Sequence, residues 1–250
     1  MSKKEVFEKY KELEDVSIQN EDGRRGIKSF VLRTNPLSLR LTNGILNYYE
    51  SYAIRYNRDD IKGKKPIDLK AHFKNKNLPL SVEIGFGNGE SFVKTAEKHK
   101  DINYFGFEVY LTGFAECLTS IGDLKLENAT LMRADAKEVL LNSVMDESID
   151  AFNIFFPDPW PKKKHHKRRL MSADFIALLT EKLKVGGSIH FATDIEDYAE
   201  ETLINLSGNK ALQNKFESFA PRAYNRESTA FERKGVLKGN KIFDLFFIKK

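Results

Sequence analysis

The sequence predicts an α/β fold built on a mostly parallel sheet with helices on both faces. From Leu80 onward, short apolar runs alternate with helical patterns, as they do in βαβ units. Several of these runs end in an acidic residue or a turn, and three closely spaced glycines follow the first run. Both features are typical of the edge of a doubly wound sheet, where such folds bind ligands.

The predicted strands are apolar runs rich in β-branched and aromatic residues. They cover Leu80–Ile84, Tyr104–Val109, Ala129–Ala134, Ile149–Phe156 and Ser188–Thr193. Helical patterns lie near 89–99, 111–121, 136–142, 172–184 and 194–207, and Asp194 is the expected N-cap of the last one. Near the C-terminus, Gly235–Asn240 separates short apolar segments, which predicts a hairpin and then a strand at Ile242–Ile248.

The first part of the 250-residue chain differs in composition from the rest. Between Gly23 and Arg58 there are seven Lys or Arg residues and one acid, and the tyrosines at 48, 52 and 56 have helical spacing. These tyrosines fit stacking on RNA bases or packing in a core, and their spacing favours the core. Residues 57–79 are polar and broken by Gly63 and Pro66. We therefore expect a basic, partly flexible extension over 1–60, a linker over 61–79 and one domain over 80–250.

Composition excludes several classes of protein. No apolar run reaches the roughly 18 residues of a membrane-spanning helix, and the N-terminus has no apolar signal segment. The single cysteine, Cys117, excludes an internal disulfide and a cysteine-rich zinc site. We expect a cytoplasmic protein, monomeric or homodimeric, that binds no membrane.

The glycine stretch after the first strand is a candidate ligand loop. Gly85, Gly87 and Gly89 alternate with other residues between a strand and a helix, which lets the backbone approach a ligand closely. The dinucleotide fingerprint requires a glycine where this chain has Glu90, and that acid repels a pyrophosphate. We expect a cofactor without phosphates here, although a plain tight turn explains the glycines as well.

Four acids lie at the ends of successive predicted strands: Glu83, Glu108, Asp135 and Asp158. Glu108 comes 19 residues after Gly89, where an acid holds the ribose hydroxyls of a nucleoside. Asp135 also fits the N-cap of the next helix. Because the carboxyl ends of parallel strands share one edge, these carboxylates converge on a crevice. They suit a cationic ligand with ribose and adenine, namely S-adenosylmethionine.

The stretch that follows the fourth strand joins a rigid loop to a cationic arm. Prolines at 157, 159 and 161 hold Asp158 and Trp160 in place. The arm has six Lys or Arg residues and no acid between 162 and 169, which suits a nucleic-acid backbone. Trp160 fits stacking on a displaced base or capping of the strand. His165 and His166 lack the spacing of metal ligands, and we expect no metal.

Several fragments make the resemblance to a known family specific. VEIGFGNGES, FGFEVY, FFPDPWPKKKHHKRRL, GGSIHFATD and TAFERKG resemble the bacterial tRNA (guanine-N7)-methyltransferases. That family belongs to the Rossmann-like class I methyltransferases, which the LKVGG turn before the fifth strand also resembles. The resemblance is loose over residues 23–56 and close over 80–248, and the proline-rich string is its most specific part.

The resemblance implies methyl transfer from S-adenosylmethionine to N7 of the guanine at position 46 of tRNA. It implies cofactor contacts for Glu83, Glu108, Asp135 and Asp158, with Gly85, Gly87 and Gly89 forming the loop beside them, and Asp158 as the catalytic residue. Contacts with the substrate or the RNA are implied for Lys162, Lys163, Lys164, His165, His166, Lys167, Arg168, Arg169, Asp194, Thr229, Ala230, Phe231 and Glu232. One position departs from the family, which has Lys where this chain has Ala230.

Two other functions compete with this one. An amino-directed nucleic-acid methyltransferase has a D-P-P-Y loop that resembles Asp158-Pro159-Trp160, but Trp160 stands where that loop has its second proline. A non-catalytic RNA-binding protein on the same fold has no need of Asp158 or the cofactor acids. The chemistry favours guanine N7, since its free lone pair requires no catalytic triad, and none stands out in the sequence.

Overall fold

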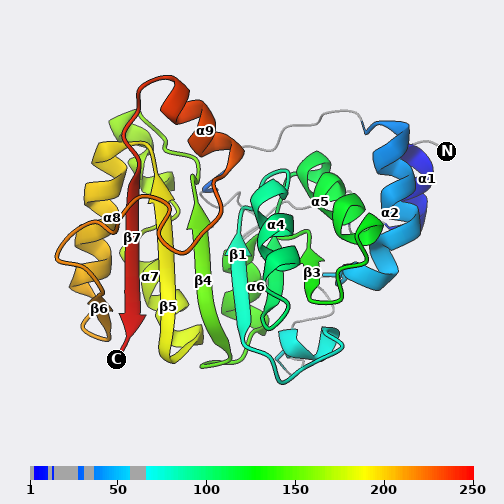
Figure 1. Cartoon of the computed structure of the whole chain (residues 1–250), viewed down its shortest axis with the longest axis horizontal. Helices are drawn as coiled ribbons and strands as arrows, with labels where there is room; N and C mark the ends of the chain where they lie inside the picture. The colour runs from blue at the N-terminus through cyan, green and yellow to red at the C-terminus, as the bar shows by residue number, and fades with distance from the viewer. Residues whose placement is uncertain (1–2, 11–12, 14–27, 31–36, 57–65) are drawn as a thin grey trace, which may run out of the picture.

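A mixed sheet occupies the centre of the molecule in this computed structural model, which describes residues 3–10, 13, 28–30, 37–56 and 66–250. Within that part of the chain the sheet has seven strands in the order β3-β2-β1-β4-β5-β7-β6 (Figure 1). The strands are β1 (Leu80–Ile84), β2 (Asn103–Phe107), β3 (Ala129–Met132), β4 (Ile149–Phe155), β5 (Leu183–Thr193), β6 (Leu212–Asn214) and β7 (Phe243–Lys249). Strands β1 to β5 pair in parallel, and β7 is antiparallel to both of its neighbours. The predicted fold class is confirmed.

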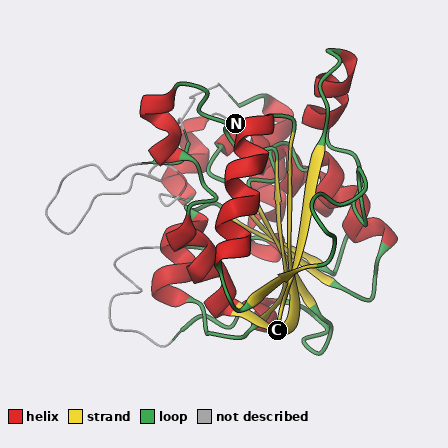
Figure 2. Ribbon diagram, turned by 90° about the vertical axis from the view of Figure 1, so that its left-hand side faces the viewer, coloured by secondary structure: helices red, strands yellow, loops and turns green. Residues whose placement is uncertain are grey.

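Helices cover both faces of the sheet, as the edge-on view in Figure 2 shows. They are α1 (Lys3–Lys9), α2 (Leu39–Tyr52), α4 (Glu90–Lys98), α5 (Leu111–Asp123), α6 (Ala136–Ser143), α7 (Ala173–Lys182), α8 (Glu196–Gly208) and α9 (Ala230–Leu237), with short 3-10 turns η2 (Leu69–His72) and η3 (Lys163–Arg168). Within the described part, none of these helices has the length and apolar character needed to cross a membrane.

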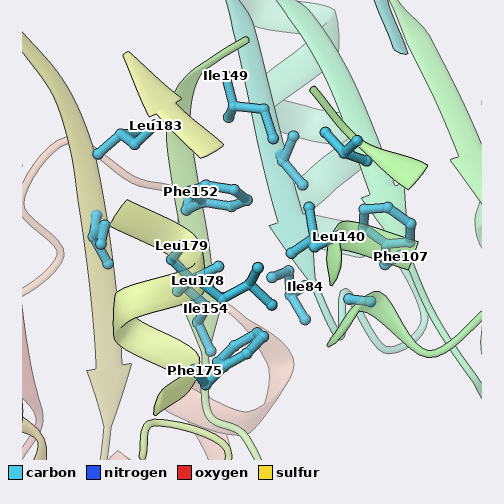
Figure 3. Close-up of a cluster of buried hydrophobic side chains, with 14 of the residues drawn as sticks. Ile84, Phe107, Leu140, Ile149, Phe152, Ile154, Phe175, Leu178, Leu179 and Leu183 are labelled. Carbon is cyan, nitrogen blue, oxygen red and sulfur yellow. The ribbon is translucent and has the colours of Figure 1, made fainter. Parts of the chain in front are cut away.

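Two apolar cores fix the layers. Buried side chains of α6, α7 and α8 form one core with β1, β4 and β5, and Figure 3 shows Ile154 of β4 beside Phe175 of α7 there. Buried side chains of α1, α2, α4 and α5 form the other core. All five residues of β1 are buried, including the polar Ser81 and Glu83, because a central parallel strand is covered on both faces.

Helix α2 packs directly on α5 through two glycines. A Cβ atom on Gly44 would lie 1.9 Å from Thr119 Oγ1, and one on Gly122 would lie 2.3 Å from the ring of Tyr48. Tyr49 is buried between the helices, with its ring 6.1 Å from that of Phe114. Tyrosines 48, 52 and 56 are partly buried against the two cores, so the core interpretation is confirmed for them.

Described residues of the expected linker, and of the segment before it, pack against the rest of the molecule. Leu69 and Phe73 belong to the core beneath α6 and α7, and Ile54 donates its backbone N–H to Leu131 O of β3. The division into residues 1–60, 61–79 and 80–250 stays a prediction.

Two predictions of local structure in the C-terminal half of the chain are wrong. Residues 230–237, expected to lead into a hairpin at Gly235–Asn240, form helix α9, because Thr229 caps the N–H of Glu232. Helix α8 begins at Glu196 without an Asp194 cap, since the side chain of Asp194 instead accepts a hydrogen bond from Asn240. Strand β6 was not predicted, because three residues carry too little pattern.

Candidate active site at the carboxyl ends of the parallel strands

The glycine loop leaves β1 in a conformation that favours glycine. Gly85, Gly87 and Gly89 have φ values of 78°, 62° and 77°, in the left-handed region. A Cβ atom on Gly85 would meet no atom within 4 Å, and one on Gly87 would meet only Phe231 Cε2, at 3.9 Å. Gly89 instead lies against α5, where a Cβ atom would be 2.4 Å from Cys117 Sγ. The first two glycines therefore border open space that can receive a ligand, and the third allows α4 to pack.

Glu108 ties this loop to the end of β2. Its buried carboxylate accepts hydrogen bonds from the backbone N–H groups of Gly87, Val109 and Tyr110, at 2.8, 2.7 and 2.9 Å. Burial raises the pKa of Glu108, and the three backbone donors oppose that rise. The side chain is thus held rigidly, at the position expected for a carboxylate that binds ribose hydroxyls.

Glu83, near the end of β1, is a buried acid with an unusual charge state. Burial raises the pKa of its carboxyl to about 8, with a further rise from Glu108, and Arg226 acts in the opposite direction. The side chain is therefore mostly neutral at pH 7, and a cation placed beside it would favour its ionised form. This property fits a pocket for a positively charged ligand.

Asp135 caps helix α6, as one of its two sequence interpretations predicts. Its Oδ1 accepts the backbone N–H of Lys137 at 2.9 Å, and burial raises the pKa of the carboxyl. A helix cap and a cofactor contact do not exclude each other, and the contact stays a prediction.

Asp158 is exposed on the loop beyond β4. The corner before it is strained, because Phe156 has a left-handed φ of 52°, and its N–H donates to Ala192 O of β5 at 2.7 Å. Trp160, at φ 45°, donates from Nε1 to Ser29 O at 2.9 Å, and the guanidinium of Arg168 lies 4.8 Å from its ring centroid. These contacts favour a structural role for Trp160 over stacking on a base.

The cationic arm is divided by the fold. Lys162, Lys163, Lys164 and Lys167 are exposed, and His165, His166 and Arg168 are partly exposed. Arg169 is buried, and its guanidinium donates to Asp197, Glu201 and Pro159 O. These bonds attach the proline loop to α8, and the RNA contact implied for Arg169 stays a prediction. Among the described residues, no group of three or more His, Cys, Asp or Glu side chains is placed to hold a metal ion.

Helix α9 lies at the same end of the sheet as the carboxyl ends of β4 and β5 (Figure 1). Phe231 is 61% exposed and next to Gly87, and Arg233 forms an ion pair of 2.5 Å with Glu90 of α4. Asp194, partly exposed at the end of β5, lies against the other end of α9, where a Cβ atom on Gly235 would be 2.9 Å from its Oδ2. The helix therefore spans the space between the glycine loop and β5.

The predicted substrate residues of this segment differ in accessibility. Thr229 is the buried cap of α9, Ala230 is its first residue, and Glu232 is fully buried with both oxygens bonded to arginines. The sequence interpretation missed those arginines, Arg222 and Arg226. One signal was available, since Asp244 interrupts an apolar strand and a buried carboxylate requires a cationic partner.

Comparisons with known proteins agree on one family. A family model described as "Putative methyltransferase" matches residues 77–245. The tRNA (guanine-N(7)-)-methyltransferase of Dechloromonas aromatica is 40% identical over 92% of this chain and 92% of its own length. A protein of the same name from Neisseria meningitidis serogroup C is 41% identical over 89% of this chain and 91% of its own. The crystal structure of the 16S rRNA methyltransferase KamB, 12% identical, has the same fold, with a TM-score of 0.51 over 69% of this chain and 88% of that one.

Proposed function

Because the chain belongs to the tRNA (guanine-N(7)-)-methyltransferase family, we propose that it transfers a methyl group from S-adenosylmethionine to N7 of guanine in tRNA. The target is the variable-loop guanine at position 46. The observation that carries the proposal within the molecule is the edge formed by the carboxyl ends of the parallel strands, which we call the crevice. The open glycine loop and the acids follow the strands there, and the exposed cationic arm comes directly after Asp158 in the chain.

The residues of the crevice fit the cofactor. S-adenosylmethionine supplies an electrophilic methyl group on a positively charged sulfonium. Gly85 and Gly87 would leave room for it along the loop, since a side chain at either position would project into open space. Glu108 is oriented for ribose hydroxyls, and Glu83 ionises when it faces a positive charge. Asp135 and Asp158 are the other two acids proposed to contact the cofactor, and they follow β3 and β4 at the same edge of the sheet.

Asp158 acts through its charge and its fixed position. Guanine N7 has a free lone pair, so no residue has to remove a proton before attack. The protein has to place N7 in line with the methyl group and to stabilise the positive charge that develops on the base. Asp158 is exposed on a loop held by prolines and by the Arg169 hydrogen bond to Pro159 O, which suits both tasks.

Recognition of the guanine edge falls to Asp194. Guanine presents N1–H and N2–H donors, which a carboxylate can accept. Asp194 is partly exposed beside α9, whereas Glu232 is buried and engaged with two arginines. Lys162, the first residue of the arm, would contact the substrate, and the exposed lysines after it would neutralise RNA phosphates. We propose a monomer or homodimer that works in the cytoplasm, where tRNA is modified.

The experiment that tests this function maps the methylated nucleotide. Purified protein, S-adenosylmethionine and a tRNA transcript are expected to give a product that is cleaved at the modified guanine by borohydride and aniline. A transcript with adenine at position 46 serves as the control and is expected to remain uncleaved. Methylation of an adenine or cytosine amino group would reject the proposal in favour of an amino-directed enzyme. Absence of any transfer, with RNA binding retained, would favour the non-catalytic alternative.

A further inference from the structure

A cluster of charged side chains, most of them buried, joins helix α9 to strand β7 next to the proposed active site. Arg226 donates from Nε and Nη2 to the two oxygens of Asp244, at 2.6 and 2.9 Å, and from Nη1 to Glu232 at 2.5 Å. His190 Nε2 lies 3.0 Å from Asp244 Oδ1, and Arg222 donates to the second oxygen of Glu232 at 2.9 Å. The side chains of Arg226, Glu232 and Asp244 are at most 2% exposed.

Arg226 connects three parts of the molecule that build the site. Glu232 belongs to α9, and Asp244 belongs to β7. The guanidinium of Arg226 also lies 5.3 Å from the ring centroid of Phe155 and 5.7 Å from that of Phe156, at the end of β4. Phe156 is the strained residue two positions before Asp158, and strained backbone persists only where its surroundings hold it. Arg226 therefore contacts the corner from which the Asp158 loop begins.

The charge of Arg226 also reaches the cofactor side. Glu83 lies near enough for Arg226 to lower the pKa of its carboxyl, against the larger effects of burial and of Glu108. The charged groups that influence the pKa of Glu83 are thus Glu108, just after β2, and Arg226, before α9. Tyr104 and Cys117 are neutral neighbours, and burial raises their pKa values, with a further rise from Glu83. One guanidinium is placed between the cofactor acid, the catalytic loop and the substrate helix.

We propose that Arg226 is a positioning residue for methyl transfer, which holds α9 and the Phe156 corner at a fixed separation across the crevice. It touches neither substrate nor cofactor. Glu232 has the same role, since both of its oxygens accept from arginines, and it acts on the reaction through Arg226 rather than by binding guanine. The proposal rests on the methyltransferase function argued above.

Planar geometry makes arginine necessary at this position. Two N–H donors bind Asp244 while a third bonds Glu232, and the guanidinium lies within 6 Å of two aromatic ring centroids. A lysine ammonium supplies the charge without the fork or the flat face. Replacing Arg226 with Lys therefore separates geometry from charge, and Arg226→Met removes both.

The test compares kcat, the KM for tRNA and the pH dependence of S-adenosylmethionine binding. In Arg226→Lys we expect kcat to fall by about 10- to 100-fold, as for a small misplacement of reacting groups, with the pH profile of cofactor binding unchanged. In Arg226→Met we expect the same loss of kcat together with a shift of that profile to higher pH, because Glu83 loses a nearby cation. Wild-type kcat in folded Arg226→Lys, or an unshifted profile in Arg226→Met, would overturn the proposal.

Lys182 provides the matched control for loss of a buried cation. Its side chain is 6% exposed and pairs with Asp146 and Glu181 at 2.5 and 2.6 Å, at the opposite end of β5 from Asp194. Lys182→Met is expected to lower the thermal midpoint and to leave kcat per folded molecule unchanged. If Lys182→Met lowers kcat as much as Arg226→Lys, the effect reports stability alone and the positioning role is rejected.

A double-variant cycle tests the assignment of Glu232. If Glu232 acts through Arg226, then Glu232→Gln combined with Arg226→Lys loses no more activity than the worse single variant. If Glu232 binds guanine itself, the fold losses of activity of the two single variants multiply in the double variant. The assignment of Glu232 as a positioning residue is then wrong. Cofactor binding is measured without RNA, so the profile shift tests Arg226 even if mapping of the methylated nucleotide rejects guanine N7 as the target.

Discussion

Replacing Glu83 with glutamine removes a titratable proton from the floor of the crevice while preserving the shape of the side chain. Burial raises the pKa of this carboxyl from 4.5 to about 8. The folded protein therefore binds more protons than the unfolded chain between these pH values. Because the pKa is raised by folding, the stabilising effect of the bound proton is complete below pH 4.5 and is lost as the pH rises through 8.

The size of this effect follows from the two pKa values. The difference corresponds to roughly 5 kcal/mol over the whole interval, and one proton gives a slope of at most about 1.4 kcal/mol per pH unit. Between pH 5.5 and 7.5, the free energy of unfolding of the wild-type protein should fall by roughly 2 to 3 kcal/mol relative to Glu83→Gln. Cofactor binding to the ionised carboxylate should release about one proton, so affinity should rise about tenfold per pH unit below pH 8.

Urea unfolding at pH 5.5, 6.5 and 7.5 measures the first quantity, and calorimetry in buffers of different ionisation enthalpy counts the released proton. Glu127→Gln is the control, since Glu127 is an exposed acid paired with Lys74 at 2.7 Å. Parallel stability curves for wild type and Glu83→Gln, or cofactor binding without proton release, would refute the placement of a neutral Glu83 in the crevice.

Three further predictions address the loop, the arm and the glycines. Asp158→Ala should lower turnover at least 100-fold while tRNA affinity in filter binding stays within about threefold, and retained turnover would remove Asp158 from the mechanism. Replacing Lys163 and Lys167 with alanine should reduce the slope of log affinity against log salt by about one for each phosphate that is no longer neutralised, so an unchanged slope would show that the arm does not bind phosphate. Gly89→Ala should destabilise the protein by about 1 to 3 kcal/mol more than Gly85→Ala in urea unfolding. Both positions have a left-handed φ, but only a Cβ on Gly89 would meet Cys117, and equal destabilisation would mean that this clash is relieved without cost.

The sheet could be predicted because its central strands are buried on both faces. Leu80–Ile84 was placed at its observed bounds, and the strand before Asp158 to within one residue of its end. Such strands carry a local signal, a short segment rich in apolar residues, and the rule that parallel strands end at one edge then places Glu83, Glu108 and Asp135 along that edge. This part of the site is determined by local sequence and topology.

The C-terminal part of the site was predicted less well than the strand ends, for two different reasons. Helix α9 had a readable signal, because Thr229-Ala230-Phe231-Glu232 has the spacing of a capping box, but Gly235 and Gly239 favoured a turn. For the ion pairs of Arg226 the sequence offered only the acid Asp244 within an apolar strand, which does not identify its partner, since Asp244 lies 18 residues away and the pairing depends on how β7 enters the sheet. Only the tertiary fold brings these charges together.

The cationic arm shows how the fold assigns different tasks to adjacent residues of one kind. In the sequence, Lys162–Arg169 is one run of positive charge, and every member is an equal candidate for RNA. The 3-10 turn η3 rotates successive side chains, so that the lysines point outward and Arg169 points inward. An arginine loses its hydration there and is stable only beside carboxylates, which α8 supplies through Asp197 and Glu201 at adjacent turns of one face. The structural role of Arg169 is therefore decided by acids more than 25 residues further along the chain, and Arg169→Ala should weaken the fold while leaving the salt dependence of RNA binding unchanged.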